Sequence, residues 1–342
     1  MGDTRTEPAW AGFPEEGLLA LRICDLDLRF EDTPLVAHVE RLAAELDAKG
    51  ITFRPEPYLG DEWFSPEDVP AISLPFWLAH PRLTALEQRM MLEVEGGDPA
   101  WCQRLLRHEC GHAIEHAYRL HRRKQRQTLF GKRSVDYDPD TYRPQPYSRS
   151  FVRHLPNWYA QAHPDEDFAE TFAVWLDPES DWRRQYRGWK ALAKLEYVDE
   201  LMREIRGQPP KVVGGPKEDA IGTIKTTLEV HYRRRRKLYE TDLPDFYDAD
   251  LKRIFSEGEP AARATAAAFL RRQRRYLIDA AARWTGARKV TVELLVKRLI
   301  ERAEKLALPM TRDEERTGLE FASWLAVVVT HWRFTGKFKR TV

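Results

Sequence analysis

The 342-residue sequence has little cysteine, no long apolar run and almost no net charge, and each of these absences excludes a class of protein. Its three cysteines, Cys24, Cys102 and Cys110, are too few and too scattered for the disulfide framework of a small secreted protein. No run of about 18 apolar residues is present, so a membrane-spanning helix is not expected. Residues 1–14 lack the basic-then-apolar pattern of a signal peptide. We therefore expect a cytoplasmic protein with no membrane partner.

The small net charge of +1 conceals two segments of opposite sign. Residues 1–208 contain 27 basic and 36 acidic residues, a net charge of −9, whereas residues 209–342 contain 28 and 18, a net charge of +10. Residues 209–217 (PPKVVGGPK) have the proline and glycine content that is typical of a linker. We expect a first domain over 1–208, a linker over 209–217 and a basic helical domain of unknown function over 218–342.

Hydrophobic periodicity at the start of the first domain predicts the order β-α-β-β-α, which is an α+β pattern. Strands are expected over 18–30, 51–59 and 71–78, with helices over 33–49, 83–94, 101–123, 165–176 and 182–205. The strand at 71–78 is either an edge that pairs with an extended substrate or an ordinary buried strand. Beyond the linker the pattern predicts an all-α region, with helices over 218–240, 247–256, 260–285, 290–307 and 311–332.

The strongest motif is His108-Glu109-Cys110-Gly111-His112, an HExxH sequence within a predicted helix. Four residues make slightly more than one helical turn, so His108 and His112 project from the same face. Two imidazoles at that spacing reach one Zn²⁺ at about 2.0–2.1 Å. Glu109 lies beside the first ligand, where it accepts a proton from a metal-bound water rather than binding the metal. The motif predicts a catalytic centre with one zinc ion per chain.

A catalytic zinc centre needs a third protein ligand, and two candidates compete. His116 continues the row of histidines, but a straight helix places it about 12 Å from His108, so three histidines in this row cannot converge. Glu166 stands in the acidic start of a later helix, where the helix dipole favours a carboxylate. We assign Glu166 as the third ligand and His116 as a neighbouring or surface residue. Glu170, one turn beyond Glu166, is expected to accept a hydrogen bond from the free ring nitrogen of a ligating histidine.

Together these motifs resemble those of known zinc peptidases. HECGH, followed by EDFAE at residues 166–170, resembles the gluzincins, and NWYAQAHPDEDFAETFAVWL resembles the bacterial family described as "putative zinc-binding metallopeptidase". The EDFAE helix is also similar to the glutamate-ligand helix of the anthrax lethal factor catalytic domain. The resemblance is firm over residues 100–180. It implies a zincin-like metallopeptidase domain, with a small mixed sheet and active-site helices.

The resemblance also implies roles for individual residues. It gives the same three zinc ligands, Glu109 as the catalytic base and Glu170 as a supporting carboxylate. In lethal-factor-like sites a tyrosine seven residues before the ligand glutamate assists the transition state, and Tyr159 stands at that position. By this analogy Tyr159 donates a hydrogen bond to the oxyanion, whereas the alternative is a packed aromatic residue. The implied reaction is hydrolysis of peptide bonds in a peptide or protein substrate.

The basic residues of the second domain permit a different interpretation. Residues 231–237 (HYRRRRK) and 271–276 (RRQRRY) are arginine-rich, and such runs bind nucleic acid through phosphate contacts. No helix-turn-helix or zinc-finger pattern accompanies them, however, and consecutive arginines on a helix point around its whole circumference. We therefore expect these helices to dock against the acidic first domain. The alternative function is a zinc-stabilised, non-catalytic binding module whose basic helices recruit a protein or nucleic-acid partner.

Overall fold

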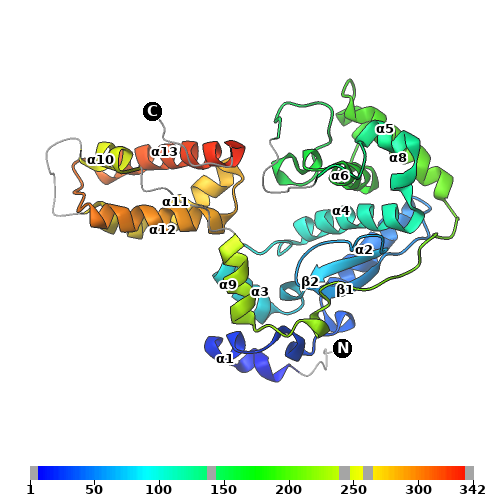
Figure 1. The fold of residues 1–342 in the computed structure, drawn as a ribbon, viewed down its shortest axis with the longest axis horizontal. Coiled ribbons are helices and arrows are strands. Elements are labelled where there is room, and N and C mark those ends of the chain that lie inside the picture. Colours follow the sequence, from blue (N-terminus) through cyan, green and yellow to red (C-terminus); the bar gives the residue numbers. More distant parts are fainter. Residues whose placement is uncertain (1–6, 137–143, 239–246, 257–264, 336–342) are drawn as a thin grey trace. The chain divides into compact units, whose positions relative to one another are not determined.

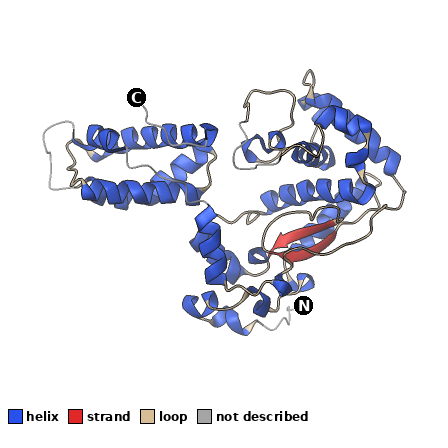
Figure 2. Cartoon of the chain, viewed as in Figure 1, coloured by secondary structure: helices blue, strands red, loops and turns tan. Residues whose placement is uncertain are grey.

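The computed structural model describes residues 7–136, 144–238, 247–256 and 265–335, and contacts between residues divide the chain into two compact units (Figure 1). The first unit contains residues 1–90 and 94–231, and the second contains residues 91–93 and 232–342. Helices predominate in both, and the described strands form one two-stranded sheet (Figure 2). Within the described ranges, no helix is long and apolar enough to cross a membrane.

The first unit is built from helices around the small sheet. Its main elements are α1 (Glu15–Leu19), α2 (Leu35–Ala48), β1 (Glu56–Gly60), β2 (Ala71–Pro75), α3 (Pro81–Met91), α4 (Pro99–Tyr118), α5 (Lys124–Phe130), α6 (Pro164–Leu176), α7 (Trp182–Gln185) and α8 (Ala191–Ile205). Helix α9 (Leu228–Leu238) begins at the end of this unit. The unit also contains the short 3-10 helices η5 (Leu120–Arg122) and η6 (Pro156–Gln161). Figure 1 shows α4 in the middle, with α2 and the sheet on one side and α6 on the other.

The first predicted strand, at residues 18–30, is wrong. This segment contains the end of α1 and two 3-10 turns, Ile23–Leu26 and Phe30–Asp32. Asp27 adopts a left-handed backbone conformation, with φ of 47°, and this breaks the alternation that had indicated a strand. In place of the expected small mixed sheet, the described residues therefore form a sheet of two parallel strands. The α+β class is retained, with a helical C-terminal region.

β1 and β2 pair in parallel, in a register that runs from Glu56 opposite Ala71 to Gly60 opposite Pro75. All five residues of β2 are buried. The amide of Ser73 in β2 also donates a hydrogen bond of 2.8 Å to the carbonyl oxygen of Phe64. β2 thus matches a buried strand and not an open edge. The helix predicted over 101–123 ends at Tyr118, the helix predicted over 182–205 is divided into α7 and α8, and the helix predicted over 218–240 begins only at Leu228, as α9. α5 lies in a segment for which no helix was predicted, and the other predicted helices of the described residues are present.

α2 packs on α4 through apolar residues and one buried ion pair. Leu42 and Leu46 are buried at helical spacing, and Glu45 between them accepts two hydrogen bonds of 2.7 Å from the guanidinium of Arg107. Both charged side chains are buried, and a buried charge is costly without such a partner. Because Arg107 directly precedes the HExxH motif, this pair fixes the rotation of α4 about its axis.

The segment that follows α8 makes backbone contacts within the first unit. The amides of Lys211 and Val212 donate to the carbonyl oxygen of Ala117, at 2.8 and 3.0 Å, and the hydroxyl of Tyr58 donates to the carbonyl oxygen of Glu218 at 2.9 Å. By its contacts this segment belongs to the first unit as far as residue 231, whereas the expected linker covers 209–217. The division into a first domain over 1–208 and a linker over 209–217 stays a prediction.

The described part of the second unit is a helical bundle. α10 (Asp248–Ser256), α11 (Ala266–Thr285), α12 (Lys289–Lys305) and α13 (Glu314–Thr335) surround an apolar core that includes Phe255, Phe269 and Phe321. The hydroxyl of Thr265 caps the start of α11 by accepting a hydrogen bond from the amide of Ala268, at 3.2 Å.

Several basic side chains of the second unit pair with acidic side chains of the same unit. Arg236 lies 2.7 Å from Glu293, and Arg302 lies 2.5 Å from Asp248. Arg271 pairs with Glu304 in the same way. These pairs balance part of the positive charge of the second unit within the unit itself. The expected docking of the basic helices against the acidic domain stays a prediction.

Candidate metal centre

Helix α4 carries the HExxH motif through the interior of the first unit. Asp98 caps its start, because its Oδ1 accepts hydrogen bonds from the amides of Ala100 and Trp101, both at 3.0 Å. Pro99 occupies the first turn, where its missing N–H costs no hydrogen bond. The side chain of His108 is 3% exposed and that of His112 is 13% exposed. The motif is therefore part of a packed interior helix, with its second histidine closer to the solvent.

Helix α6 supplies two carboxylates from a start that is held in place by polar contacts. The Nδ1 of His163 caps the helix by accepting a hydrogen bond from the amide of Asp165, at 3.2 Å. Buried Lys194 lies 2.5 Å from Asp167. Glu166 and Glu170 are both buried, one helical turn apart, and both contact histidines of α4. The carboxylates are thus directed at the HExxH motif by a fixed helix.

Gly111 allows α4 and α6 to approach each other closely. A Cβ atom on Gly111 would lie 2.7 Å from the Cα atom of Ala169 and 3.0 Å from its carbonyl oxygen. No real Cβ atom tolerates a backbone contact this short, so the close approach requires glycine at this position. Gly111 is adjacent to His112, and Ala169 is adjacent to Glu170. The contact therefore determines how near the side chains of the two helices come.

The three predicted zinc ligands meet at one point. Nε2 of His108 lies 3.0 Å from Oε2 of Glu166, and Nε2 of His112 lies 3.3 Å from the same oxygen. The two nitrogens are 3.2 Å apart. Ligand atoms of a tetrahedral zinc ion, each about 2.0–2.1 Å from the metal, lie about 3.3 Å from one another. Two imidazole nitrogens and one carboxylate oxygen also form a donor set of catalytic zinc sites, so these residues can hold such an ion.

The hydrogen bond on the far side of His108 shows why a cation fits this triangle of ligand atoms. Nδ1 of His108 lies 2.8 Å from Oε1 of Glu170 and donates to that carboxylate. In the neutral ring this leaves a lone pair on Nε2, which faces the carboxylate oxygen of Glu166. A lone pair and a carboxylate oxygen repel each other unless a positive charge lies between them. The arrangement predicted for Glu170 is thus present, although the role of each residue stays a prediction.

The electrostatics of the histidines and glutamates point in the same direction. Burial alone would raise the pKa of Glu166, but His112 and His108 outweigh it and hold that pKa well below its usual value. Burial alone would lower the pKa of His108, but Glu166 and Glu170 raise it well above its usual value. The centre therefore attracts positive charge, and a metal ion competes with protons for the same atoms.

Glu109 lies beside the ligand atoms and is not one of them. Its side chain is buried, and burial raises the pKa of its carboxyl group against the opposing effect of His108 and His112. A carboxylate whose pKa is raised accepts a proton more readily near neutral pH than an ordinary one. This placement suits the base that the sequence predicted, and the catalytic role stays a prediction.

Tyr159 lies on η6, and the centroid of its ring is 5.6 Å from that of His108. The two residues before it, Asn157 and Trp158, have left-handed backbone conformations with φ of 70° and 56°. This conformation is uncommon for residues other than glycine and often occurs at functional sites. The tyrosine that the resemblance indicated is thus beside the first histidine of the motif.

Two supporting features had no usable signal in the sequence. His154 is buried, its Nε2 lies 2.9 Å from the carbonyl oxygen of Arg104, and it interacts electrostatically with Glu170. Buried Arg126 joins α4 to the start of α6, because its guanidinium lies 2.7 Å from Glu115 and 2.5 Å from Asp165. These partners are 11 and 39 positions from Arg126. No local periodicity connects residues so far apart.

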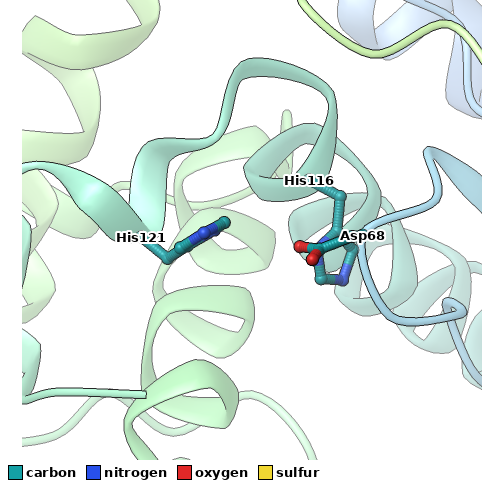
Figure 3. Close-up of side chains that lie close together, drawn as sticks. All are labelled: Asp68, His116 and His121. Carbon is teal, nitrogen blue, oxygen red and sulfur yellow. The ribbon is translucent and has the colours of Figure 1, made fainter. Parts of the chain in front are cut away.

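Two further residues of α4 lie outside the triangle. Cys110 is buried, and burial raises the pKa of its thiol, so it packs as a small apolar residue. His116 was expected to be a neighbouring or surface residue. It is buried, and it forms a second group of candidate ligands with Asp68 and His121 (Figure 3).

A model of a known protein family matches part of the chain. The family model described as "putative zinc-binding metallo-peptidase" matches residues 105–182. This range contains the HExxH motif, Tyr159 and both glutamates of α6. Comparisons with curated proteins and with solved structures gave no match. The family match supports a zinc-binding metallopeptidase, and it ends before the second unit.

Proposed function

We propose that the chain is a zinc-dependent peptidase of gluzincin type, with a zincin-like first domain. In this proposal His108, His112 and Glu166 bind one zinc ion. The observation that carries the proposal is the triangle of their ligand atoms, whose edges measure 3.0, 3.2 and 3.3 Å. The family match over the same two helices supports it.

The residues around the triangle have distinct tasks in peptide hydrolysis. A bound zinc ion supplies Lewis-acid chemistry, which lowers the pKa of water towards about 7 and polarises a carbonyl group. Glu109 takes the proton of the attacking water and later gives it to the leaving amine. Glu170 keeps the proton of His108 on Nδ1, so that the lone pair of Nε2 would be available to bind the ion. Tyr159 donates its phenol hydrogen to the oxygen on which negative charge develops.

The test is the cleavage of a peptide library by zinc-loaded wild type and by Glu109→Gln, with zinc measured on both. The variant should keep its zinc, because Glu109 is not a ligand, and should lose about 10²–10⁴-fold in rate. Glu40→Gln removes the same charge from an exposed position on α2 and should cleave as wild type does. Full activity of Glu109→Gln would contradict the mechanism. A zinc-loaded wild type that cleaves no peptide would instead favour the non-catalytic binding module.

A further inference from the structure

We propose that Asp68, His116 and His121 form a second zinc site in the first unit. Three segments provide them: Asp68 lies between β1 and β2, His116 lies in the last turn of α4, and His121 lies on η5 (Figure 3). One ligand atom from each residue lies within 4.8 Å of the other two. Two imidazole nitrogens and a carboxylate oxygen make a donor set that zinc binds in proteins. The proposal is independent of the peptidase function.

Both histidines have a ring nitrogen that lacks a partner among the described residues. Nδ1 of His116 and Nδ1 of His121 are buried atoms, and neither makes a hydrogen bond within the described ranges. The side chain of His116 is 7% exposed, and its Nδ1 lies 3.8 Å from Oδ1 of Asp68, which is too long for a hydrogen bond. A buried polar atom without a partner costs free energy. One metal ion among the three side chains would satisfy both nitrogens.

The protonation state of the two rings also suits a metal. Burial lowers the pKa of His116 to about 3, and burial lowers the pKa of His121 as well. Both imidazoles are therefore neutral at pH 7, and the neutral ring is the form that binds a metal ion.

The backbone bends so that the three side chains converge. α4 ends at Tyr118, and the left-handed φ of 54° at the next residue, Arg119, turns the chain and brings His121 back towards His116. Asp68 has a left-handed φ of 56° in its own loop. Figure 3 shows the carboxylate of Asp68 beside the ring of His116, with the ring of His121 directed towards them. These turns place residues of separate segments around one point.

Arg133 contacts Asp68 without excluding a metal ion. Its Nη1 donates to Oδ1 of Asp68 at 3.0 Å, which orients the carboxylate while other lone pairs of its oxygens remain. The charge of Arg133 is balanced by Glu67, at 2.8 Å, and by Asp165, at 3.4 Å. The side chain of Asp68 is 60% exposed and His121 is half-buried, so both can rotate to bring the ligand atoms to the spacing of about 3.3 Å.

The test is the zinc content of the full chain after equilibrium dialysis against buffered free Zn²⁺. Wild type should bind two zinc ions per chain, and the count should fall to one in His121→Gln and in Asp68→Asn. His112→Gln should also bind one, and the double variant His112→Gln/His121→Gln none. His38→Gln, which changes a histidine of α2 outside both groups, should bind two. His121 and Asp68 are not buried, so circular dichroism should show that their variants keep the native helix content.

One zinc ion in wild type, or two zinc ions in both His121→Gln and Asp68→Asn, would overturn the second site. Loss of one ion in His112→Gln reports only on the first centre. Failure of the second site is thus distinguishable from failure of the proposed peptidase centre.

Discussion

Gly111 of α4 and Ala169 of α6 are in backbone contact, since a Cβ atom on Gly111 would lie 2.7 Å from the Cα atom of Ala169. This contact lies between the histidines of one helix and the glutamates of the other. The geometry of the candidate metal centre therefore depends on a residue that is not one of its predicted ligands.

Gly111→Ala should weaken zinc binding and destabilise the first unit. In an ordinary helix interior, alanine is more stable than glycine by about 0.5–1 kcal/mol. Here the added methyl group must push α6 away, which should cost about 1–3 kcal/mol. Alanine should therefore be less stable than glycine at this position. Thermal unfolding and competition with a zinc chelator measure the two effects. Gly17→Ala in α1 is the matched control, because its Cβ atom would meet nothing closer than 3.7 Å. Equal changes in unfolding temperature and in zinc affinity for the two variants would contradict the role of the contact.

Glu170→Gln should lower zinc affinity about 10–100-fold, as expected when the partner of a ligating histidine is changed. The carboxylate accepts from Nδ1 of His108 at 2.8 Å and from the amide of Leu155 at 2.9 Å. A neutral amide accepts more weakly than a carboxylate and leaves His108 less basic. Isothermal titration with Zn²⁺ measures the change. Unchanged affinity in a folded Glu170→Gln would show that this carboxylate does not support the ligand.

Tyr159→Phe should keep its zinc and lose about 10²–10³-fold in kcat, because it removes one donor to the developing oxyanion. KM should change little, since the hydroxyl acts in the transition state. Steady-state kinetics on a peptide that wild type cleaves separates the two constants. A variant with the wild-type kcat would leave Tyr159 as a packed aromatic residue beside His108.

His116 should make the metal-free protein sensitive to acid. Its pKa is about 3 in the folded chain, mainly because of burial, and about 6.5 when unfolded. The unfolded state therefore binds more protons, so this contribution to stability is complete above about pH 6.5 and is lost as the pH falls towards about 3.

Because one proton is involved, the unfolding free energy should change by about 1.4 kcal/mol per pH unit. From pH 6.5 to 5, wild type in chelator should lose about 2 kcal/mol more unfolding free energy than His116→Gln does. Urea unfolding at several pH values measures both curves, with His38→Gln as the control that keeps the wild-type slope. Parallel curves for wild type and His116→Gln would show that His116 is not held neutral by burial.

The sequence predicted those parts of the centre that depend on helical period alone. His108 and His112, like Glu166 and Glu170, share a face because four residues make about one turn. Hydrophobic alternation, in contrast, gave a wrong prediction at residues 18–30, where Leu26, Leu28 and Phe30 indicated a strand. The left-handed turn at Asp27 has no counterpart in hydrophobic periodicity.

The rest depends on contacts between distant segments. Nothing local indicates that Gly111 meets Ala169, or that Asp68 lies beside His116. His116 could be excluded from the first centre by helix length, but its own partners follow from how the loop between β1 and β2 packs against α4. Sequence spacing therefore predicted the residues that meet in the first group, and only the fold indicated the second group.

Anomalous diffraction at the zinc absorption edge from crystals of the zinc-loaded wild type tests the central claim most directly. The account predicts a zinc peak about 2.0–2.2 Å from Nε2 of His108, from Nε2 of His112 and from a carboxylate oxygen of Glu166. A zinc-loaded crystal with no peak among these three residues would contradict it.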